Sequence, residues 1–198
     1  MMEVVEIEEI IKESIGRKAL ENHTEIFNSL RDLKKDAVVV NIGAGAGTSA
    51  LAIIEQRNDL AKTTYTIDLR DDDNPFGGHM NERNAFRNAG MLELLPNQIK
   101  GDSKKIGKEW SGQKVDLLII DGDHSTEGCL GDIKSWEPNL KSTALVLIHD
   151  YQAEKWPAVK NVVDKIIKED ARYTKIKVVD TYILIKYNAR SKNKTAEK

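Results

Sequence analysis

Apolar residues recur along the chain in two periods, one typical of helices and the other of buried strands. Residues 2–33 carry apolar positions at helical spacing, and a break near 14–16 predicts two helices there. Farther along, short and nearly continuous apolar runs rich in β-branched residues indicate strands of the kind that a buried parallel sheet contains. The predicted strands are 37–42, 63–68, a short one within 97–103, 115–120 and 144–148.

Helical patterns lie between these strands, at 48–57, 79–94, 103–110, 125–136 and 158–168. The regular alternation of strand and helix predicts a Rossmann-like α/β fold with a doubly wound, mostly parallel sheet, preceded by N-terminal helices.

The last two predicted strands lie within 173–187 and are joined by a tight turn at Asp180–Thr181. This turn is too short for a crossover helix, so we expect one antiparallel strand near the C-terminus. The expected organisation is a helical extension or cap at 1–35, one domain at 36–188, and a disordered polar tail at 189–198.

Composition narrows the classes of function. The chain has 198 residues, with 30 Lys and Arg against 32 Asp and Glu, so its net charge is −2. No overall basic field would hold a nucleic-acid backbone, and nucleic acid is therefore not an expected partner. The single cysteine, Cys129, excludes an internal disulfide and a cysteine zinc cluster, and it fits a reducing, cytoplasmic compartment. We expect no signal peptide and no membrane partner, because no apolar run approaches the ~20 residues that span a bilayer.

A doubly wound sheet binds ligands beyond the carboxyl ends of its strands, so the residues that follow each strand are the candidates for chemistry. Gly43, Gly45 and Gly47 follow the first strand, where glycine lets the backbone turn sharply and approach a ligand. The turn predicts a nucleotide-type cofactor site, although a plain strand-to-helix turn has the same pattern. Read from Gly45, the sequence also matches a GxGxxA dinucleotide fingerprint, which leaves a nicotinamide cofactor open.

Carboxylates end the next two strands. Asp68 could accept hydrogen bonds from both hydroxyls of a ribose. Asp102 could accept one from an adenine amino group, while Asp102 or Ser103 could instead cap the following helix.

Acids and histidines gather after the fourth and fifth strands. They are Asp121, Asp123, His124, His149 and Asp150. Neighbouring strands lie ~5 Å apart, so these side chains are expected to reach one crevice. Burying like charges together is costly, and a divalent cation would compensate for them. The alternative is a set of solvated loop acids with one structural histidine.

Taken in order, five segments resemble the motifs of class I S-adenosylmethionine-dependent methyltransferases. They are VVVNIGAGAGTSALAI, YTIDLR, IKGDS, VDLLIIDGDHSTEGCLGDIKSWEPNL and ALVLIHDY, and the resemblance covers about residues 36–187. The stretch Asp121–Tyr151 most resembles the branch that holds macrocin O-methyltransferase and cephalosporin-biosynthesis-type enzymes, which is related to catechol O-methyltransferase.

The resemblance implies S-adenosylmethionine as the cofactor and assigns roles to the strand-end residues. The glycine turn would hold the methionine end, Asp68 the ribose and Asp102 the adenine. It also implies that the last strand inserts between its partner and the fifth strand. In metal-dependent relatives, acids at the positions of Asp121 and Asp150 hold Mg²⁺.

Two residues depart from the family pattern. Asn41 stands where the family often has an acid near the amino group of the cofactor, and it carries no charge. His149 precedes Asp150 where metal-dependent relatives often pair two oxygen ligands, which makes a softer metal or no metal conceivable.

We therefore expect O-methylation of a small-molecule hydroxyl, assisted by a divalent metal or by a histidine base, in a chain that could form a homo-oligomer. The expected cofactor-binding residues are Asn41, Gly43, Gly45, Gly47, Asp68, Asp102, Ser103 and Asp121. The expected catalytic residues are His124, Asp121 and His149, and the expected metal ligands are Asp121, His149 and Asp150. The rival functions are a nicotinamide-dependent oxidoreductase and a non-catalytic binding module with a methyltransferase-like fold.

Overall fold

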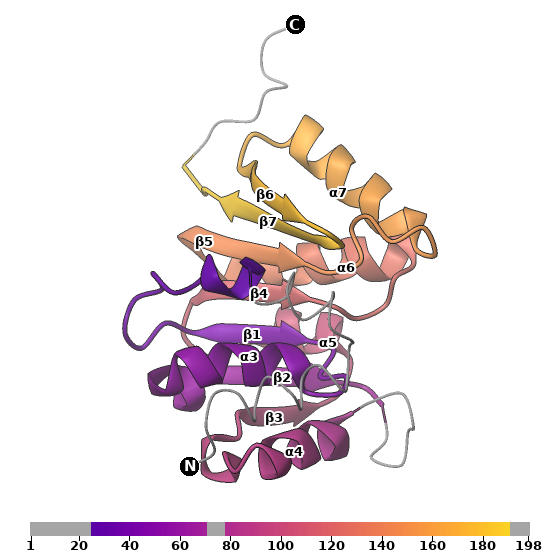
Figure 1. The fold of residues 1–198 in the computed structure, drawn as a ribbon. Coiled ribbons are helices and arrows are strands. Elements are labelled where there is room, and N and C mark those ends of the chain that lie inside the picture. The colour runs from indigo at the N-terminus through magenta and orange to yellow at the C-terminus, as the bar shows by residue number, and fades with distance from the viewer. Residues whose placement is uncertain (1–24, 71–77, 191–198) are drawn as a thin grey trace, which may run out of the picture. The chain divides into compact units, whose positions relative to one another are not determined.

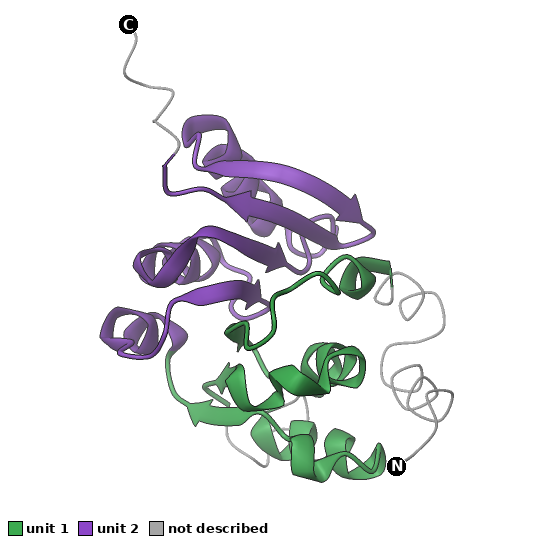
Figure 2. Cartoon of the chain, turned by 90° about the vertical axis from the view of Figure 1, so that its left-hand side faces the viewer, with its two compact units in different colours: residues 1–102 green, residues 103–198 purple. Residues whose placement is uncertain are grey.

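A computed structural model describes residues 25–70 and 78–190, which form two compact units with their boundary after Asp102 (Figure 2). Residues 71–77 lie outside the described residues, as do parts of two predicted segments, the N-terminal extension and the C-terminal tail. The predicted division into an extension, one domain and a tail stays a prediction.

The first unit is built on three parallel strands in the order β3-β2-β1 (Figure 1). The strands are β1 (Val39–Ile42), β2 (Thr64–Asp68) and β3 (Asn97–Lys100). Its helices are α3 (Thr48–Gln56) and α4 (His79–Asn88), with 3-10 turns at Asn58–Thr63 and Leu92–Leu94. All four residues of β1 are buried, as the continuous apolar run predicts.

The second unit contains four strands in the order β4-β5-β7-β6. They are β4 (Val115–Ile120), β5 (Leu140–Ile148), β6 (Tyr173–Val179) and β7 (Tyr182–Tyr187). Its helices are α5 (Ser103–Glu109), α6 (Thr126–Trp136) and α7 (Pro157–Glu169), with a 3-10 turn at Glu137–Asn139. Helix α6 packs between α5 and α7 and buries Trp136 completely.

Strand β7 lies between β5 and β6 and is antiparallel to both, whereas β4 and β5 are parallel. These pairings and the alternation of strands with helices confirm the predicted Rossmann-like α/β fold with one antiparallel strand near the C-terminus.

Two predicted boundaries are wrong for local reasons. The helix expected at 79–94 ends at Asn88, because Gly90 takes a left-handed φ of 65° and closes a Schellman motif. In that motif Gly90 N–H donates to Arg87 O, and Met91 N–H donates to Phe86 O. The strand expected at 144–148 begins at Leu140, where polar residues conceal the strand in the sequence pattern.

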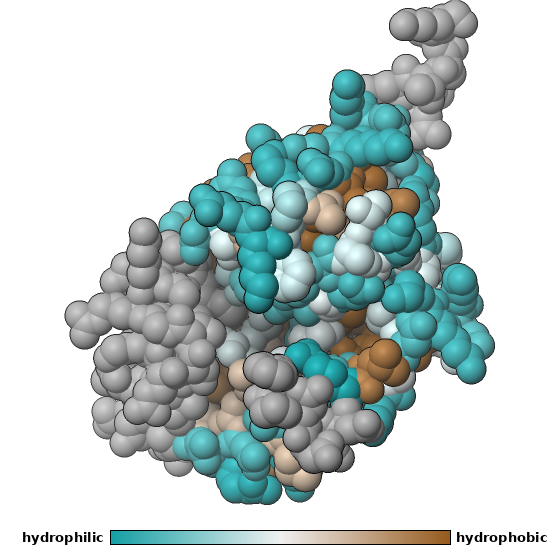
Figure 3. Space-filling model, turned by 90° about the vertical axis from the view of Figure 1, so that its right-hand side faces the viewer, coloured by the Kyte–Doolittle hydropathy of each residue, from teal (hydrophilic) through white to brown (hydrophobic). Residues whose placement is uncertain are grey.

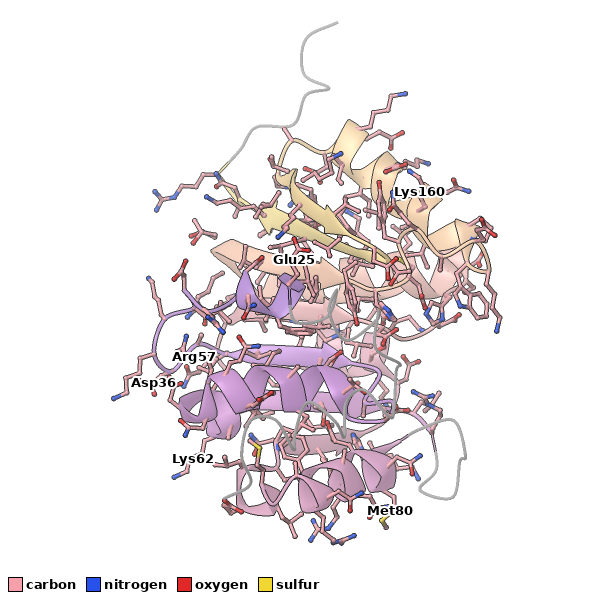
Figure 4. The ribbon with its side chains drawn as sticks, viewed as in Figure 1. Glu25, Asp36, Arg57, Lys62, Met80 and Lys160 are labelled. Carbon is pink, nitrogen blue, oxygen red and sulfur yellow. The ribbon has the colours of Figure 1, made fainter. Side chains whose placement is uncertain are left out.

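Arg57 fastens the segment that leads into β1. Its Nη1 atom donates to the carbonyl oxygens of Arg31 and Leu33 at 2.9 and 2.6 Å. The same guanidinium pairs with Asp59 through two atoms, which fixes its plane. The guanidinium of Arg57 (Figure 4) therefore connects the C-terminal end of α3 with a segment more than 20 residues earlier in the chain.

We predict that Arg57→Ala lowers the free energy of unfolding by about 2–3 kcal/mol, because several charge-assisted hydrogen bonds are lost together. Arg57→Lys should restore only part of this, since an ammonium group cannot reproduce the planar fork. Urea unfolding curves measure both variants. Arg87→Ala, which removes an exposed arginine from α4, is the matched control. Equal midpoints for Arg57→Ala and this control would contradict the assignment.

Candidate functional site

The glycine turn begins level with the end of the neighbouring strand. Gly43 N–H donates to Ile67 O at 2.8 Å, so the chain leaves β1 beside the end of β2. Gly43, Gly45 and Gly47 all have positive φ, at 85°, 55° and 84°, a conformation that a side chain opposes. Helix α3 starts directly after Gly47, with its first N–H groups near the turn.

Gly45 and Gly47 lack a side chain for different reasons. A Cβ atom at Gly47 would lie 2.8 Å from Cα of Glu82, so this glycine is required for packing against α4. Among the described residues other than its chain neighbours, a Cβ atom at Gly45 would meet nothing within 4 Å. The turn thus leaves open space beside a bare backbone at Gly45, where a ligand can approach closely.

Asp68 lies next to this space. It is buried, and its Oδ2 atom accepts a hydrogen bond from Gly45 N–H at 3.3 Å. Burial opposes its ionisation, but hydrogen bonds from the Arg70 guanidinium and backbone N–H outweigh burial and lower the pKa of the carboxyl group. Asp68 is therefore an anion, and a ribose would have to share or replace Arg70 at this carboxylate.

The other predicted cofactor residues differ in what surrounds them. Asn41 is fully buried on β1, and within the described residues neither polar atom of its amide has a partner. Asp102 is exposed in the turn after β3. Ser103 begins α5 and donates its hydroxyl to Asp132 of α6, a contact that cofactor binding through Ser103 would have to break.

The second unit brings four of the five predicted acids and histidines together. Asp121 follows β4, His149 and Asp150 follow β5, and His149 N–H donates to Ile120 O at 3.0 Å. His149 Nδ1 lies 3.0 Å from Asp121 Oδ1. His124 Nε2 lies 2.8 Å from Asp150 Oδ2 and 3.6 Å from Asp121 Oδ1. We name Asp121, His124, His149 and Asp150 the His–Asp cluster.

Asp123 has a hydrogen-bond partner outside the cluster. It is exposed, and its Oδ1 atom accepts a hydrogen bond from Ser125 N–H at 2.9 Å. Ser125 in turn caps α6 by accepting from Gly128 N–H. Asp123 thus organises the start of a helix, and the expectation that it joins the other four residues stays a prediction.

Ion pairing sets the charges of the cluster. The close carboxylates of Asp121 and Asp150 stabilise the protonated imidazole and raise the pKa of His124 to about 9. Burial opposes ionisation of Asp121, but the two histidines overcome it and lower its pKa to about 2. At neutral pH His124 is therefore an imidazolium. In this arrangement it can donate a proton but cannot accept one, which weighs against its predicted role as a general base.

Two aromatic residues that the sequence analysis does not assign to the site flank the histidines. Trp156 stacks on His124 with ring centroids 4.6 Å apart, and Tyr182 stacks on His149 at 4.3 Å. An aromatic face favours a cationic imidazole, so both rings support the charge pattern of the cluster. Trp156 precedes α7 and Tyr182 begins β7, and no spacing in the sequence connects them with Asp121.

Part of the cluster has the donor chemistry of a metal site. One ligand atom each from Asp121, His124 and Asp150 lie within 4.8 Å of one another. Nε2 of His124 is buried and has close ionic contacts but no well-aligned hydrogen bond. Mg²⁺ prefers ligands that are all oxygen atoms. Two carboxylates and an imidazole are better suited to a cation that binds both oxygen and nitrogen ligands. His124 replaces His149 of the predicted set in this group.

Most of the described surface on the face in Figure 3 is hydrophilic, with apolar patches between the polar residues. Large apolar side chains that are exposed include Leu69, Met80, Leu130 and Ile176. Leu69 is 68% exposed and directly follows Asp68, so an apolar surface adjoins the carboxylate. Among the described helices, none has the length and apolar character that crossing a membrane requires.

A family model of a methyltransferase domain matches residues 40–151, which include the glycine turn and the His–Asp cluster. The chain belongs to this methyltransferase family. None of the curated proteins is significantly similar to it in sequence.

Solved structures share the fold at low sequence identity. The O-methyltransferase NovP is 18% identical, with a TM-score of 0.65 over 88% of this chain and 81% of NovP. The SAH-bound methyltransferase PaMTH1 from Podospora anserina is also 18% identical, with a TM-score of 0.67 over 93% of this chain and 87% of PaMTH1. An O-methyltransferase family protein from Burkholderia thailandensis is 12% identical, with a TM-score of 0.56 over 88% and 60% of the two chains.

The two glycines give a matched pair of variants. Gly45→Ala and Gly47→Ala both place a side chain at positive φ, at a similar cost of about 1 kcal/mol. Gly47→Ala should lose a further ~2 kcal/mol, because its Cβ meets the backbone of α4. Gly45→Ala should instead fold well and bind S-adenosylhomocysteine at least tenfold more weakly. Thermal unfolding and titration calorimetry separate these effects, and wild-type affinity in Gly45→Ala would place the ligand elsewhere.

The raised pKa of His124 predicts pH-dependent stability. Its contribution is complete below its ordinary pKa of 6.5 and is lost as pH rises through about 9. At pH 6, His124→Gln should lower the free energy of unfolding by about 1–3 kcal/mol, and the variant and wild type should converge by about pH 9.5. Urea unfolding at the two pH values measures this. Glu127→Gln, exposed on α6, controls for a change of charge alone, and an equal loss at both pH values would contradict the ion-pair account.

Proposed function

We propose that this protein is an S-adenosylmethionine-dependent O-methyltransferase that acts on a hydroxyl group of a small molecule. The observation that carries the proposal is the open space at Gly45 beside the ionised Asp68, within a chain that belongs to a methyltransferase family. The branch with macrocin O-methyltransferase stays our preferred assignment. It is supported by the residues Asp121–Tyr151 and by the fold shared with O-methyltransferases.

The first unit would bind the cofactor. The turn at Gly43, Gly45 and Gly47 offers backbone without side chains to the methionine end. Asp68 would accept hydrogen bonds from the ribose hydroxyls once Arg70 releases or shares it, and the exposed Leu69 beside it offers apolar surface to a flat ring. Asp102 is exposed in the turn after β3 and would accept a hydrogen bond from the adenine amino group.

The second unit would prepare the acceptor. The sulfonium is already an activated methyl donor, so the protein has to orient the reactants, exclude water and remove the hydroxyl proton. For a phenol with a pKa near 10, reaction at pH 7 requires a stabilisation of the anion by about 4 kcal/mol. The imidazolium of His124 would stabilise an oxyanion, and Asp121 and Asp150 would hold that imidazolium in place.

A divalent cation is the alternative source of that stabilisation. Asp121, His124 and Asp150 would hold it, and when bound it would act as a Lewis acid that lowers the pKa of the acceptor hydroxyl. Binding requires neutral His124, so a cation would have to displace the proton of this imidazole.

The rival functions explain less. A nicotinamide-dependent oxidoreductase would use the same glycine turn and Asp68, but it gives no role to the His–Asp cluster. A non-catalytic binding module is favoured only by the uncharged Asn41. Titration calorimetry with S-adenosylhomocysteine and with NAD distinguishes the methyltransferase from the oxidoreductase, because each enzyme should bind only its own cofactor. Asp68→Ala, which should weaken S-adenosylhomocysteine at least tenfold, locates the binding.

The deciding experiment is methyl transfer to a panel of phenol, catechol and sugar hydroxyls, with products detected by mass, after chelation and with graded additions of Mg²⁺, Mn²⁺ or Zn²⁺. If the imidazolium stabilises the oxyanion, chelator should have no effect and His124→Gln should reduce the rate by about 10²–10⁴-fold. If a cation does so, chelator and Asp150→Asn should each abolish transfer while cofactor binding persists. Asn tolerates the left-handed φ of 56° at this position. Cofactor binding without transfer to any acceptor class would favour the binding module.

A further inference from the structure

Three polar residues form a row across the strands of the first unit. Asn41 of β1 is paired with Thr66 of β2, and Thr66 is paired with Gln98 of β3. Residues paired directly across parallel strands point to the same face of the sheet. A buried face of a sheet normally carries apolar side chains at such positions. Burying a row of polar side chains beneath a helix is costly unless they form hydrogen bonds.

Glu82 of α4 supplies part of that partner. Its side chain is fully buried, and its Oε2 atom accepts hydrogen bonds from Thr66 Oγ1 at 2.8 Å and Gln98 Nε2 at 2.7 Å. Its Oε1 atom is buried and has no partner among the described residues, and the same holds for both amide atoms of Asn41. The atoms without a hydrogen-bond partner thus belong to Glu82 and to Asn41, which lies at the β1 end of the row beneath Glu82.

The row lies directly beneath the glycine turn. Asn41 is two residues before Gly43 on the same strand. Gly78 N–H, at the start of α4, donates to Gly45 O at 3.0 Å, and Glu82 N–H donates to Gly78 O at 3.1 Å. Gly47 packs against Cα of Glu82. Any change in the position or charge of Glu82 is therefore transmitted to the backbone that surrounds the open space at Gly45.

We propose that Glu82 is a positioning residue of the cofactor-binding turn, whose buried negative charge, together with the amide of Asn41, favours the cationic ammonium end of the cofactor and makes cofactor binding depend on pH. The inference rests on the proposed cofactor site. A water molecule that accepts from Asn41 and donates to Glu82 would complete the row, since buried polar groups usually have such a partner.

The surroundings of Glu82 explain the pH dependence. Burial raises its pKa to about 7, hydrogen bonds from Gln98 and Thr66 oppose this, and the negative charge of Asp68 adds to it. His79, also on α4, is buried, and its Nε2 atom lies 3.2 Å from Thr66 O. The partners of Glu82 are uncharged, so its charge changes near neutral pH.

The test removes the carboxylate at Glu82 of α4 and introduces one at Asn41 of β1. The four proteins are wild type, Glu82→Gln, the double variant Asn41→Asp/Glu82→Gln, and Glu93→Gln, which removes an exposed carboxylate from the same unit. Titration calorimetry measures S-adenosylhomocysteine affinity from pH 6 to 8.5, and thermal unfolding without ligand reports folding.

We expect wild-type affinity to rise as pH increases through about 7, because ionised Glu82 attracts the ammonium group. Glu82→Gln should bind about tenfold more weakly at pH 8 with no such rise. It should also unfold at a higher temperature than wild type at pH 8, since burying a neutral amide costs less than burying a carboxylate. The double variant should return to within about threefold of wild type, and Glu93→Gln should match wild type.

A merely structural role gives a different pattern. Equal loss of affinity in Glu82→Gln and the double variant would show that the charge is not needed and would overturn the inference. The same conclusion would follow from a wild-type pH profile retained in Glu82→Gln. Absence of S-adenosylhomocysteine binding by wild type at every pH would instead overturn the proposed cofactor site, and the inference with it.

Discussion

The parallel register of β1, β2 and β3 is the constraint on which the candidate cofactor site depends. It sets Ile42 opposite Ile67 and Asp68 opposite Lys100, so that the three strands end at one level. Backbone hydrogen bonds continue the register past the strand ends, from Gly43 N–H to Ile67 O and from Gly101 N–H to Asp68 O. The glycine turn and the carboxylate consequently meet, and Gly45 N–H donates to Asp68. A shift by one residue would turn the Asp68 side chain to the other face of the sheet.

In the second unit, too, parallel pairing brings the residues after two strands together. There the site is formed by oppositely charged side chains and not by the open space that a glycine leaves. Parallel pairing sets Ile120 opposite Ile148, and the next residues of the two strands are Asp121 and His149. Each carboxylate there has an imidazole within ion-pair distance, and each imidazole is stacked on an aromatic ring. The contacts pair the carboxylates with imidazoles, and a cation would compete with the proton on His124.

The sequence predicts the fold well because its main signals are local. β-branched runs mark the buried strands, and the short turn at Asp180–Thr181 requires an antiparallel pair. One boundary error arises where Gly90 ends a helix that the apolar pattern would continue, and the other where polar residues of a strand make contacts that the pattern cannot show. Lys141, for example, lies in β5, and its Nζ atom is 2.6 Å from Asp116 Oδ2 of β4. The polar start of β5 therefore has the sequence pattern of a loop.

The candidate site is predicted in part for the same reason. Strand ends identify Asp68, Asp121 and His149, since topology alone brings them to an edge of a sheet. They do not show that Asp123 accepts a hydrogen bond at the start of α6, or that Ser103 donates its hydroxyl to Asp132. The stacking of Trp156 on His124 and the burial of Glu82 over Thr66 depend on how helices and loops pack, which leaves no periodic trace in the sequence.

Two buried carboxylates, Asp68 and Glu82, and the half-buried Asp121 show how partner chemistry decides charge. Asp68 faces a guanidinium and has a lowered pKa, and Asp121 faces two imidazoles and has a pKa of about 2. Glu82 is buried more deeply, its donors among the described residues are a hydroxyl and an amide, and its pKa rises to about 7. Desolvation raises the pKa of all three, so the difference lies in the charge of the donors. Asp68 and Asp121 are fixed anions suited to hold a ligand or a cation, whereas the charge of Glu82 responds to pH and to any cation that binds above it.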